Sequence, residues 1–344
     1  MSANLQLYRE DSERVAARRS ELFVETTLER CERVALATAY ALKPARIGGL
    51  PKLARLWLGD MLAPTRKLPS VNEACRFTGL CGIARDLSVP SLLAAYKQGL
   101  FPGGHTAPVK WYSPDARCVL FFDDIRIEKT VRRLMRKRHY RVTFDRDFDG
   151  VIKACAARRP GKWHVTWITP EIMHAYAALH DAGHAHSYEV WNAAGELVGG
   201  GYGVAIGGAF FGESQFSRER NTSKIGQAVL AWHLANWGFA YDDSKWPAPT
   251  LLNMGFRMIP RGEFVAITHA AIERPTKRGA WEIEGDLATI ADWRPNGMSD
   301  VMEAPAIGTA ESRARAYVRR SLLPLLPAVD YATVGLGEAM LRLV

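Results

Sequence analysis

A dense run of positive charge is the part of the sequence whose chemistry is easiest to recognise. Between Arg126 and Arg141 the chain has eight lysines and arginines and a single acid, Glu128. Basic side chains in such number can neutralise nucleic-acid phosphates, and contacts of this kind need no reading of bases. The predicted contacts recur at helical spacing and are Lys129, Arg132, Arg133, Arg136 and Lys137. The alternative is a charged helix face that meets only solvent.

The sequence has no obvious nucleophile and no metal pattern. It contains no G-x-S-x-G string and no evident Cys/His nucleophile pair. Its five cysteines show neither C-x-x-C nor Cys/His metal spacing, which favours free thiols in a reducing compartment. His184 and His186 point the same way from a strand, but no third ligand is evident. We therefore expect chemistry without a covalent enzyme intermediate, a metal or a cofactor.

The composition is that of a folded protein with a basic balance. The chain has 344 residues, of which 48% are hydrophobic and 24% charged, enough for two compact domains plus appendages. Its net charge of +9 favours a polyanionic partner. The sequence has no apolar run of about 18 residues and no apolar signal core near its start. We expect a cytoplasmic monomer without a membrane span.

Two helical segments precede the main body in the sequence. Residues 9 to 40 predict one helix with a face formed by Val15, Leu22, Leu28, Cys31 and Ala35. The stretch from Leu50 to Met61 is short, amphipathic and basic. We expect it to pack on its own domain, and the alternatives are a partner protein or a membrane surface.

From Gly79 onwards the pattern indicates short strands with one helix at a time. Helices are predicted from Ser88 to Gly99, over 148–157, and from Pro170 to Gly183. Two hairpins follow over 187–216. Asn221 then caps a helix that ends near Gly238, and a strand comes next. This order of elements predicts a mixed α and β domain.

Four groups of sequence strings carry a family resemblance. They are DLSVPSLLAAYKQGLFP with WYSPDAR (86–117), TWIT (166–169), AHSYEVW with GELVGGGYGVAIGGAFFGESQFSR (185–218), and NMGFRMIPRGEF (253–264). Together they resemble the leucyl/phenylalanyl-tRNA-protein transferase family, bacterial enzymes that add an amino acid to a protein N-terminus. The resemblance covers about residues 75 to 270 and is far more specific than a single short motif.

The resemblance implies an α+β fold with a GNAT-like acyltransferase domain. It divides the chain into a helical N-terminal extension (1–74), a small α/β tRNA-binding domain (75–150), a GNAT-like catalytic domain (151–275) and a C-terminal extension (276–344). The donor would be aminoacyl-tRNA in place of acetyl coenzyme A, and the basic segment coincides with the family's tRNA-binding cluster. The turn SRERNTSK, at the position of a coenzyme A loop, has no glycine.

The catalytic residues that the resemblance implies depart in part from the family pattern. Glu213 falls on the family's active-site glutamate, and Asp243 on the aspartate of its Asp-Cys-Gln element. Lys245 stands where the family has a glutamine thought to relay a proton. A charged lysine cannot accept a hydrogen bond, although burial could lower its pKa enough for it to act as a base.

The implied aminoacyl pocket departs as well. Gly201 and Gln215 replace two methionines of well-known members, and Asp242 replaces an apolar residue. A roomier, more polar pocket predicts a polar or cationic aminoacyl group, since methionine-lined walls suit Leu, Phe or Met. The remaining substrate-binding residues predicted are Trp111, Tyr112, Trp167, Tyr202, Phe211, Ser214, Asn221 and Ser223. The first three of these could stack on the 3′ adenine or on the aminoacyl side chain.

Three functional hypotheses follow from the sequence. The first is transfer of an aminoacyl group from tRNA to the α-amine of a protein or peptide. The second keeps the donor but uses a small molecule, a lipid or a biosynthetic peptide as acceptor. The third is a non-catalytic homologue that binds tRNA or a degradation signal.

Overall fold

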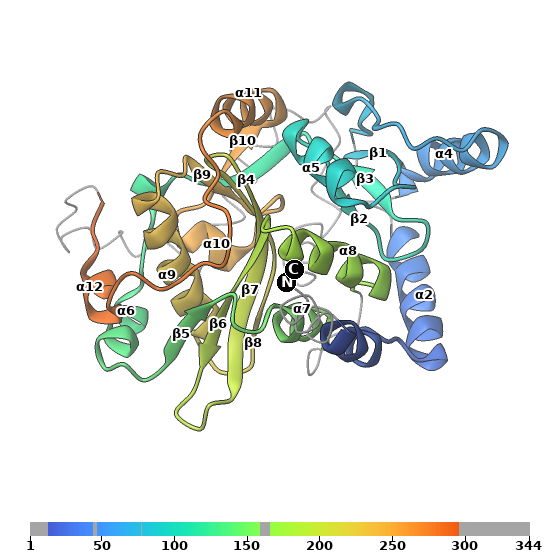
Figure 1. Ribbon diagram of the computed structural model, residues 1–344. Helices are drawn as coiled ribbons and strands as arrows, with labels where there is room; N and C mark the ends of the chain where they lie inside the picture. The colour runs from blue at the N-terminus through green and yellow to red at the C-terminus, as the bar shows by residue number, and fades with distance from the viewer. Residues whose placement is uncertain (1–12, 44–46, 77, 159–165, 296–344) are drawn as a thin grey trace, which may run out of the picture.

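The computed structural model describes residues 13–43, 47–76, 78–158 and 166–295. In these ranges a mixed sheet of seven strands lies between two helical layers, and a sheet of three strands flanks it (Figure 1). The α+β class predicted from the sequence is confirmed. None of the described helices combines the length and hydrophobicity needed to cross a bilayer.

The large sheet runs in the order β10-β4-β9-β8-β7-β6-β5. Its strands are β4 (Ala116–Leu120), β5 (Arg141–Phe144), β6 (Ala185–Trp191), β7 (Leu197–Ile206), β8 (Ala209–Ser217), β9 (Tyr241–Asp243) and β10 (Arg257–Pro260). Strands β6, β7 and β8 form the two predicted hairpins. The pair β8 and β9 is parallel, and every other neighbouring pair is antiparallel.

Each face of the sheet has its own apolar core and its own helices. The first face is covered by α5 (Val89–Lys97), α7 (Phe148–Ala156), α8 (Pro170–Asp181) and α11 (Arg261–Ile272). The second is covered by α6 (Lys129–Arg136), α9 (Thr222–Asn236), α10 (Pro249–Asn253) and α12 (Leu287–Asp292). The active-site candidates on β8 and β9 therefore lie between two packed layers (Figure 1).

The predicted boundary at residue 150 does not divide the sheet. Strands β4 and β5 precede it, yet β4 pairs with β9 and β10, and β5 pairs with β6. The hydrogen bonds that a sheet requires thus join segments from the two predicted domains. The small sheet is separate from the large one and has the strand order β1-β3-β2. Its strands are β1 (Leu80–Ile83), β2 (Phe101–Gly103) and β3 (Lys110–Tyr112).

The N-terminal prediction of one helix over 9–40 is wrong within the described residues. The chain is helical over 13–22, breaks at Phe23, and starts α2 (Thr27–Ala41) with a capping box formed by Thr26 and Glu29. Of the predicted apolar face, Leu22 packs against the core, but Val15, Leu28, Cys31 and Ala35 are exposed. The helix over 13–22 is instead attached to α7 and α8 by Arg19, whose guanidinium contacts Asp149 on α7 and Asp181 on α8.

Other segments differ from expectation in how they pack. The predicted C-terminal extension begins at residue 276, but Trp281 is 1% exposed and stacks on His186 with ring centroids 3.8 Å apart. Asn221 is at the N-cap of α9 as predicted, but its φ is 71° and its side chain makes no capping hydrogen bond. The described region also has α4 (Leu50–Leu62) and the short 3-10 helices η1 (Val71–Glu73) and η2 (Phe122–Asp124).

Candidate active site

An irregularity in β8 places the first catalytic candidate. Tyr202 pairs with Ser214 and Gly203 with Gly212, so Glu213 is an extra residue without a partner in β7. Such bulges redirect a side chain and are common beside active sites. Lys245 follows β9 with a φ of 60°, a left-handed conformation uncommon outside glycine. The two backbone irregularities turn Glu213 and Lys245 towards one another.

Glu213 and Lys245 form a buried ion pair. Lys245 Nζ lies 2.5 Å from Glu213 Oε1 and donates a second hydrogen bond to the Gly212 carbonyl at 2.7 Å. The side chains of Lys245 and Glu213 are only 4% and 2% exposed. Because an unpaired buried charge is costly, each charge holds the other in place. An ammonium group has three N–H donors, and these contacts use two of them.

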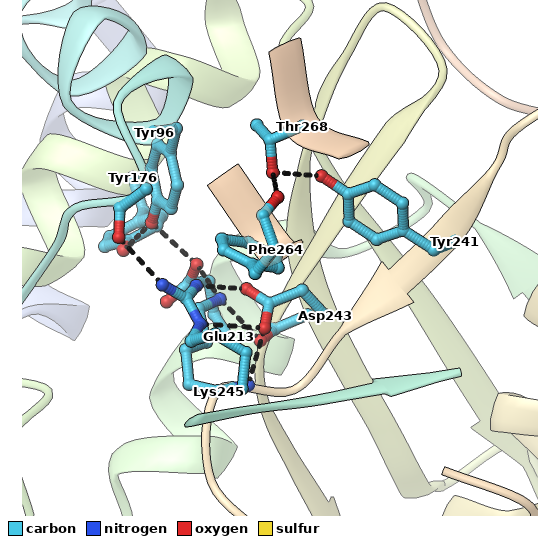
Figure 2. Close-up of polar contacts among 11 residues, drawn as sticks. Tyr96, Tyr176, Glu213, Tyr241, Asp243, Lys245, Phe264 and Thr268 are labelled. Atoms are coloured by element: carbon cyan, nitrogen blue, oxygen red, sulfur yellow. Dashed lines mark hydrogen bonds and ion pairs between the residues drawn. The ribbon is translucent and has the colours of Figure 1, made fainter. Parts of the chain in front are cut away.

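Two tyrosines extend this pair into a hydrogen-bonded chain (Figure 2). The Tyr96 hydroxyl on α5 donates to Glu213 Oε1 at 2.6 Å and lies 2.5 Å from the Tyr176 hydroxyl on α8. Burial raises the pKa of both phenols well above their usual range, and the charge of Glu213 raises the pKa further. Both hydroxyls therefore stay protonated and act as fixed donors.

Asp243 lies beside this chain but is tied to a different partner. Its carboxylate pairs with the Arg117 guanidinium through both oxygens, with Arg117 Nε 3.1 Å from Oδ1, and both side chains are fully buried. Arg117 also donates to the Gly99 carbonyl and lies over the ring of Phe264. Asp243 Oδ1 accepts from the backbone N–H of Lys245 at 3.0 Å. This geometry suits a carboxylate that positions the Lys245 turn (Figure 2).

Asp242 faces the opposite side of the sheet. Its Oδ2 accepts a hydrogen bond of 2.7 Å from Gln227 on α9, and the residue is 1% exposed. Burial raises the pKa of Asp242 to about 7, although the bond from Gln227 lowers it. Asp242 and Asp243 therefore have different environments, because successive residues of a strand point to opposite faces.

The predicted pocket residues Gly201 and Gln215 meet at Tyr188. The Tyr188 hydroxyl donates to Gln215 Oε1 at 3.0 Å. A Cβ at position 201 would lie 2.7 Å from the same hydroxyl. The expectation of a roomier pocket is therefore wrong at this position, because Tyr188 takes the space that the glycine leaves.

The aromatic residues predicted to bind substrate differ in how deeply they are buried. Trp111 is 2% exposed and belongs to the apolar core, so the prediction that it stacks on a base is not supported. Tyr202 and Phe211 are also buried and contact the rings of Tyr176 and Tyr96 respectively. Trp167 is partly buried and lies edge-on to Tyr176, and Tyr112 is partly exposed and stacks on Phe101.

Phe101 lies between the ion pair and the exposed Trp246. Lys245 Nζ lies 5.9 Å from the centroid of its ring. The ring also contacts Trp246, which is 42% exposed, edge to face at 6.5 Å. A substrate reaching Glu213 and Lys245 from this side would pass aromatic surfaces. Ser214, Asn221 and Ser223 are partly exposed along β8 and the start of α9.

The basic segment forms α6 and the turn that follows it. Lys129, Arg133, Arg136 and Lys137 are exposed. Arg132 is 8% exposed, and its guanidinium donates to the backbone carbonyls of Ile127, Ala291 and Trp293. The prediction that Arg132 contacts phosphate is therefore wrong, because its donors anchor α6 to the chain around α12.

Sequence reasoning missed three residues of the site: Tyr96, Tyr176 and Arg117. In the sequence the two tyrosines resemble ordinary members of apolar helix faces, where a phenol ring and a leucine give the same pattern. Arg117 ends the string WYSPDAR and lies in a strand whose next three residues are buried. An arginine within a buried strand was the available signal, since such a charge needs a partner.

The sequence of this chain matches a known protein family over the residues that form the candidate site. Residues 119–269 match the family model described as leucyl/phenylalanyl-tRNA protein transferase, and residues 85–115 match its N-terminal domain. A protein of that name from Alkalilimnicola ehrlichii is 42% identical over 69% of this chain and 92% of its own length. Another, from Pseudomonas syringae pv. syringae, is 46% identical over 60% of this chain and 91% of its own.

Among solved structures, FemX is 11% identical, with a TM-score of 0.35 over 43% of this chain and 60% of FemX. That likeness is too small to bear on function. The sequence matches are different in kind, because they cover more than half of the chain and include β8, β9 and all three catalytic candidates. The chain therefore belongs to the leucyl/phenylalanyl-tRNA-protein transferase family.

Proposed function

We propose that this protein moves an aminoacyl group from a charged tRNA to the α-amine at the N-terminus of a protein or peptide. The observation that carries the proposal is the buried Glu213 and Lys245 pair, held between β8 and the turn after β9. It lies within the residues matched by the family model.

The reaction is aminolysis of an ester, which is already activated. The amine nitrogen attacks the carbonyl carbon, a C–N bond forms, and the bond from that carbon to the ribose oxygen breaks. One proton must leave the nitrogen and one must reach the ribose oxygen. Positioning, proton transfer and stabilisation of the developing oxyanion are the tasks left to the protein.

The ion pair can perform the proton transfer. Glu213 takes the proton that the attacking nitrogen loses, and Lys245 donates one to the departing ribose oxygen. The 2.5 Å contact between them then returns that proton to Lys245, so the pair ends as it began. The proton donated to the ribose oxygen is the third N–H of Lys245, since the other two bond Glu213 and the Gly212 carbonyl, and until that transfer the ammonium charge favours the developing oxyanion. Tyr96 holds Glu213 throughout.

We further propose that the tRNA acceptor stem binds the exposed face of α6. Its contacts are Lys129, Arg133, Arg136 and Lys137, with Arg132 omitted because it is buried. A hollow of about 500 Å³ beside the end of α6 is lined in part by Arg138, His139 and Arg141, which continues the basic surface. Such contacts would bind phosphates without regard to base sequence.

The transferred amino acid is a separate proposal. The relatives are named for leucine and phenylalanine. Here Gln215 carries a polar group at a position that resembles a pocket position of the family and accepts a hydrogen bond from Tyr188, whereas Asp242 faces the side of the sheet opposite to Asp243 and is held by Gln227. We propose a polar or cationic aminoacyl group on that account, and a clear preference for leucine or phenylalanine would contradict it.

A small-molecule acceptor is the second candidate. It is favoured by the narrow access to the ion pair, since Glu213 and Lys245 are 2% and 4% exposed. A slim amine would reach them more easily than a polypeptide end.

One experiment separates these possibilities. The full chain is incubated with each of a panel of tRNAs carrying radiolabelled amino acids, together with a peptide whose N-terminus is free. Label on the peptide α-amine is the expected result, and an N-acetylated peptide is the control that should remain unlabelled. Label found only on added small amines would replace the proposed acceptor, and no label at all would contradict transferase activity.

A further inference from the structure

Helix α4 presents an apolar face outwards. Trp57, Leu58, Met61 and Leu62 are 51%, 60%, 72% and 78% exposed. These positions lie on one side of a helix, since residues three and four apart are neighbours. No residue of α4 is buried. The helix lies outside the residues matched by the family models, so the transferase chemistry does not explain it.

The opposite side of α4 fixes this orientation. Leu53 and Leu56 are partly buried, and α4 lies beside β1. Asp60 on the same side pairs with Arg85 at 2.5 Å, and its side chain is only 10% exposed. In Figure 1, α4 projects from the small sheet, away from the layers that cover the large one. The side that carries Asp60 thus meets the protein, and the apolar face described above meets solvent.

The charge around α4 is strongly positive. Residues 42–70 contain six lysines and arginines and one acid, Asp60. Because Asp60 is paired inwards with Arg85, the outer surface carries basic groups without an acid from this segment. Lys52 and Arg55 lie on the helix itself, and Arg66 and Lys67 are exposed just after it.

We propose that α4 binds the surface of a bilayer that contains anionic phospholipids. Trp57, Leu58, Met61 and Leu62 enter the boundary between headgroups and acyl chains, where an indole ring is well accommodated. Arg55, Arg66 and Lys67 are exposed, lie at the phosphate level and supply the electrostatic attraction, whereas Lys52 is partly buried on the Asp60 side of the helix. A protein partner would have to cover the same apolar face, but it would not account for the exposed basic groups beside it, Arg55 on the helix and Arg66 and Lys67 just after it.

The test measures binding of the full chain to vesicles by flotation. Vesicles of phosphatidylcholine alone are compared with vesicles that also contain phosphatidylglycerol. We expect binding to the anionic vesicles, and raising the salt from about 0.1 M to about 1 M should weaken it because the charges are exposed. The double variant Leu58→Glu/Met61→Glu should reduce the partition coefficient at least about tenfold, because two apolar side chains no longer enter the lipid.

The matched control is Leu28→Glu, which changes an equally exposed leucine on α2. It should bind vesicles as the unmodified protein does. The charge variant Arg55→Glu/Arg66→Glu keeps the apolar face and should lose the preference for anionic vesicles. The proposal is overturned if vesicles do not bind, or if Leu28→Glu weakens binding as much as the α4 variants. It is also overturned if the chain forms a dimer that Leu58→Glu/Met61→Glu dissociates while vesicles have no effect.

Discussion

Among single residues, Lys245 carries the largest change in chemistry relative to the family pattern. A glutamine at this position can accept and donate hydrogen bonds but carries no charge. The lysine adds a cation that is compensated by Glu213 at 2.5 Å. In the proposed mechanism the ammonium group of Lys245 beside the Glu213 carboxylate passes a proton between the amine and the ester oxygen.

Replacing Lys245 tests this route. Lys245→Met removes the cation while keeping a long side chain, and the rate constant of aminoacyl transfer should fall by about tenfold to ten-thousandfold, a range typical of removing an acid-base group. Lys245→Gln should retain more activity, because an amide can still donate to Glu213 and to the Gly212 carbonyl. The rates are measured in a single turnover with pre-bound charged tRNA. Equal activity of Lys245→Met and the unmodified protein would exclude a role for the ammonium group.

Asp242 predicts a pH dependence of stability. Burial raises its pKa to about 7 from an ordinary value of 3.8. Between these values the folded protein keeps the proton that the unfolded chain has released, so the free energy of unfolding falls as the pH rises through this window. Asp242→Asn does not titrate there and should gain stability relative to the unmodified protein, on the order of a few kcal/mol, between about pH 4 and pH 8.

Urea denaturation of both proteins across this pH range measures the difference directly. Parallel stability profiles would mean that Asp242 keeps an ordinary pKa. The comparison does not depend on activity, and so it remains informative whatever amino acid the enzyme transfers.

At the scale of elements, the site depends on how β4, β9 and β8 are joined. Arg117 on β4 pairs with Asp243 on β9, and Asp243 in turn holds the Lys245 turn. Arg117 also reaches the Gly99 carbonyl just after α5, the helix that carries Tyr96. One buried ion pair therefore links the elements that supply the catalytic chain.

Breaking this pair should be costly. Arg117→Met leaves the fully buried Asp243 without a counter-charge, and the free energy of unfolding should fall by about 3–5 kcal/mol. The double variant Arg117→Met/Asp243→Leu removes both charges and should restore much of that stability. Urea denaturation of the two variants checks the expectation, and an unchanged stability of Arg117→Met would show that the pair contributes little.

The elements also show how far sequence reasoning reaches. The hairpins of β6 to β8 and the helix and strand that follow were predictable, because their apolar periods and turn residues are local signals. The break at Phe23 between two N-terminal helices was missed, although Thr26 and Glu29 have the spacing of a capping box that starts the second helix. The pairing of β4 with β9 was not predictable, since a three-residue strand has no periodic pattern.

The same distinction between local sequence signals and long-range contacts applies to the site residues. Glu213 and Lys245 were predictable from family strings, and the structure brings them into contact. Tyr96 and Tyr176 were not, because their sequence signal is that of a core aromatic. The filling of the space at Gly201 by Tyr188 depends on a side chain that lies across two strands, which spacing along the chain does not encode.

On the scale of the whole molecule, positive charge is distributed over two separate surfaces. One is α6, within the matched family region, and the other surrounds α4, outside it. The first is proposed to bind RNA and the second lipid. Both ligands carry phosphates, so the two surfaces must be distinguished by matched charge reversals.

Charge reversal on α6 should change the salt dependence of tRNA binding by a predictable amount. Arg133→Glu/Lys137→Glu on α6 should weaken binding of tRNA and reduce the slope of log affinity against log salt by about 1 for each phosphate that is no longer neutralised. Arg66→Glu/Lys67→Glu makes the same change in net charge near α4 and should leave the slope as it is. Filter binding over a range of salt concentrations measures both. Equal effects of the two variants would mean that tRNA responds to net charge and has no site on α6.

The central claim is that Glu213 and Lys245 catalyse aminoacyl transfer and do not merely bind the donor. The most direct measurement compares tRNA affinity and single-turnover transfer to a free peptide N-terminus for the unmodified protein and for Glu213→Gln. The account predicts unchanged affinity for the charged tRNA and a rate at least about tenfold lower in the variant. Tight tRNA binding by both proteins, with no transfer by either, would contradict it and identify the chain as a binding protein that keeps the fold of the family.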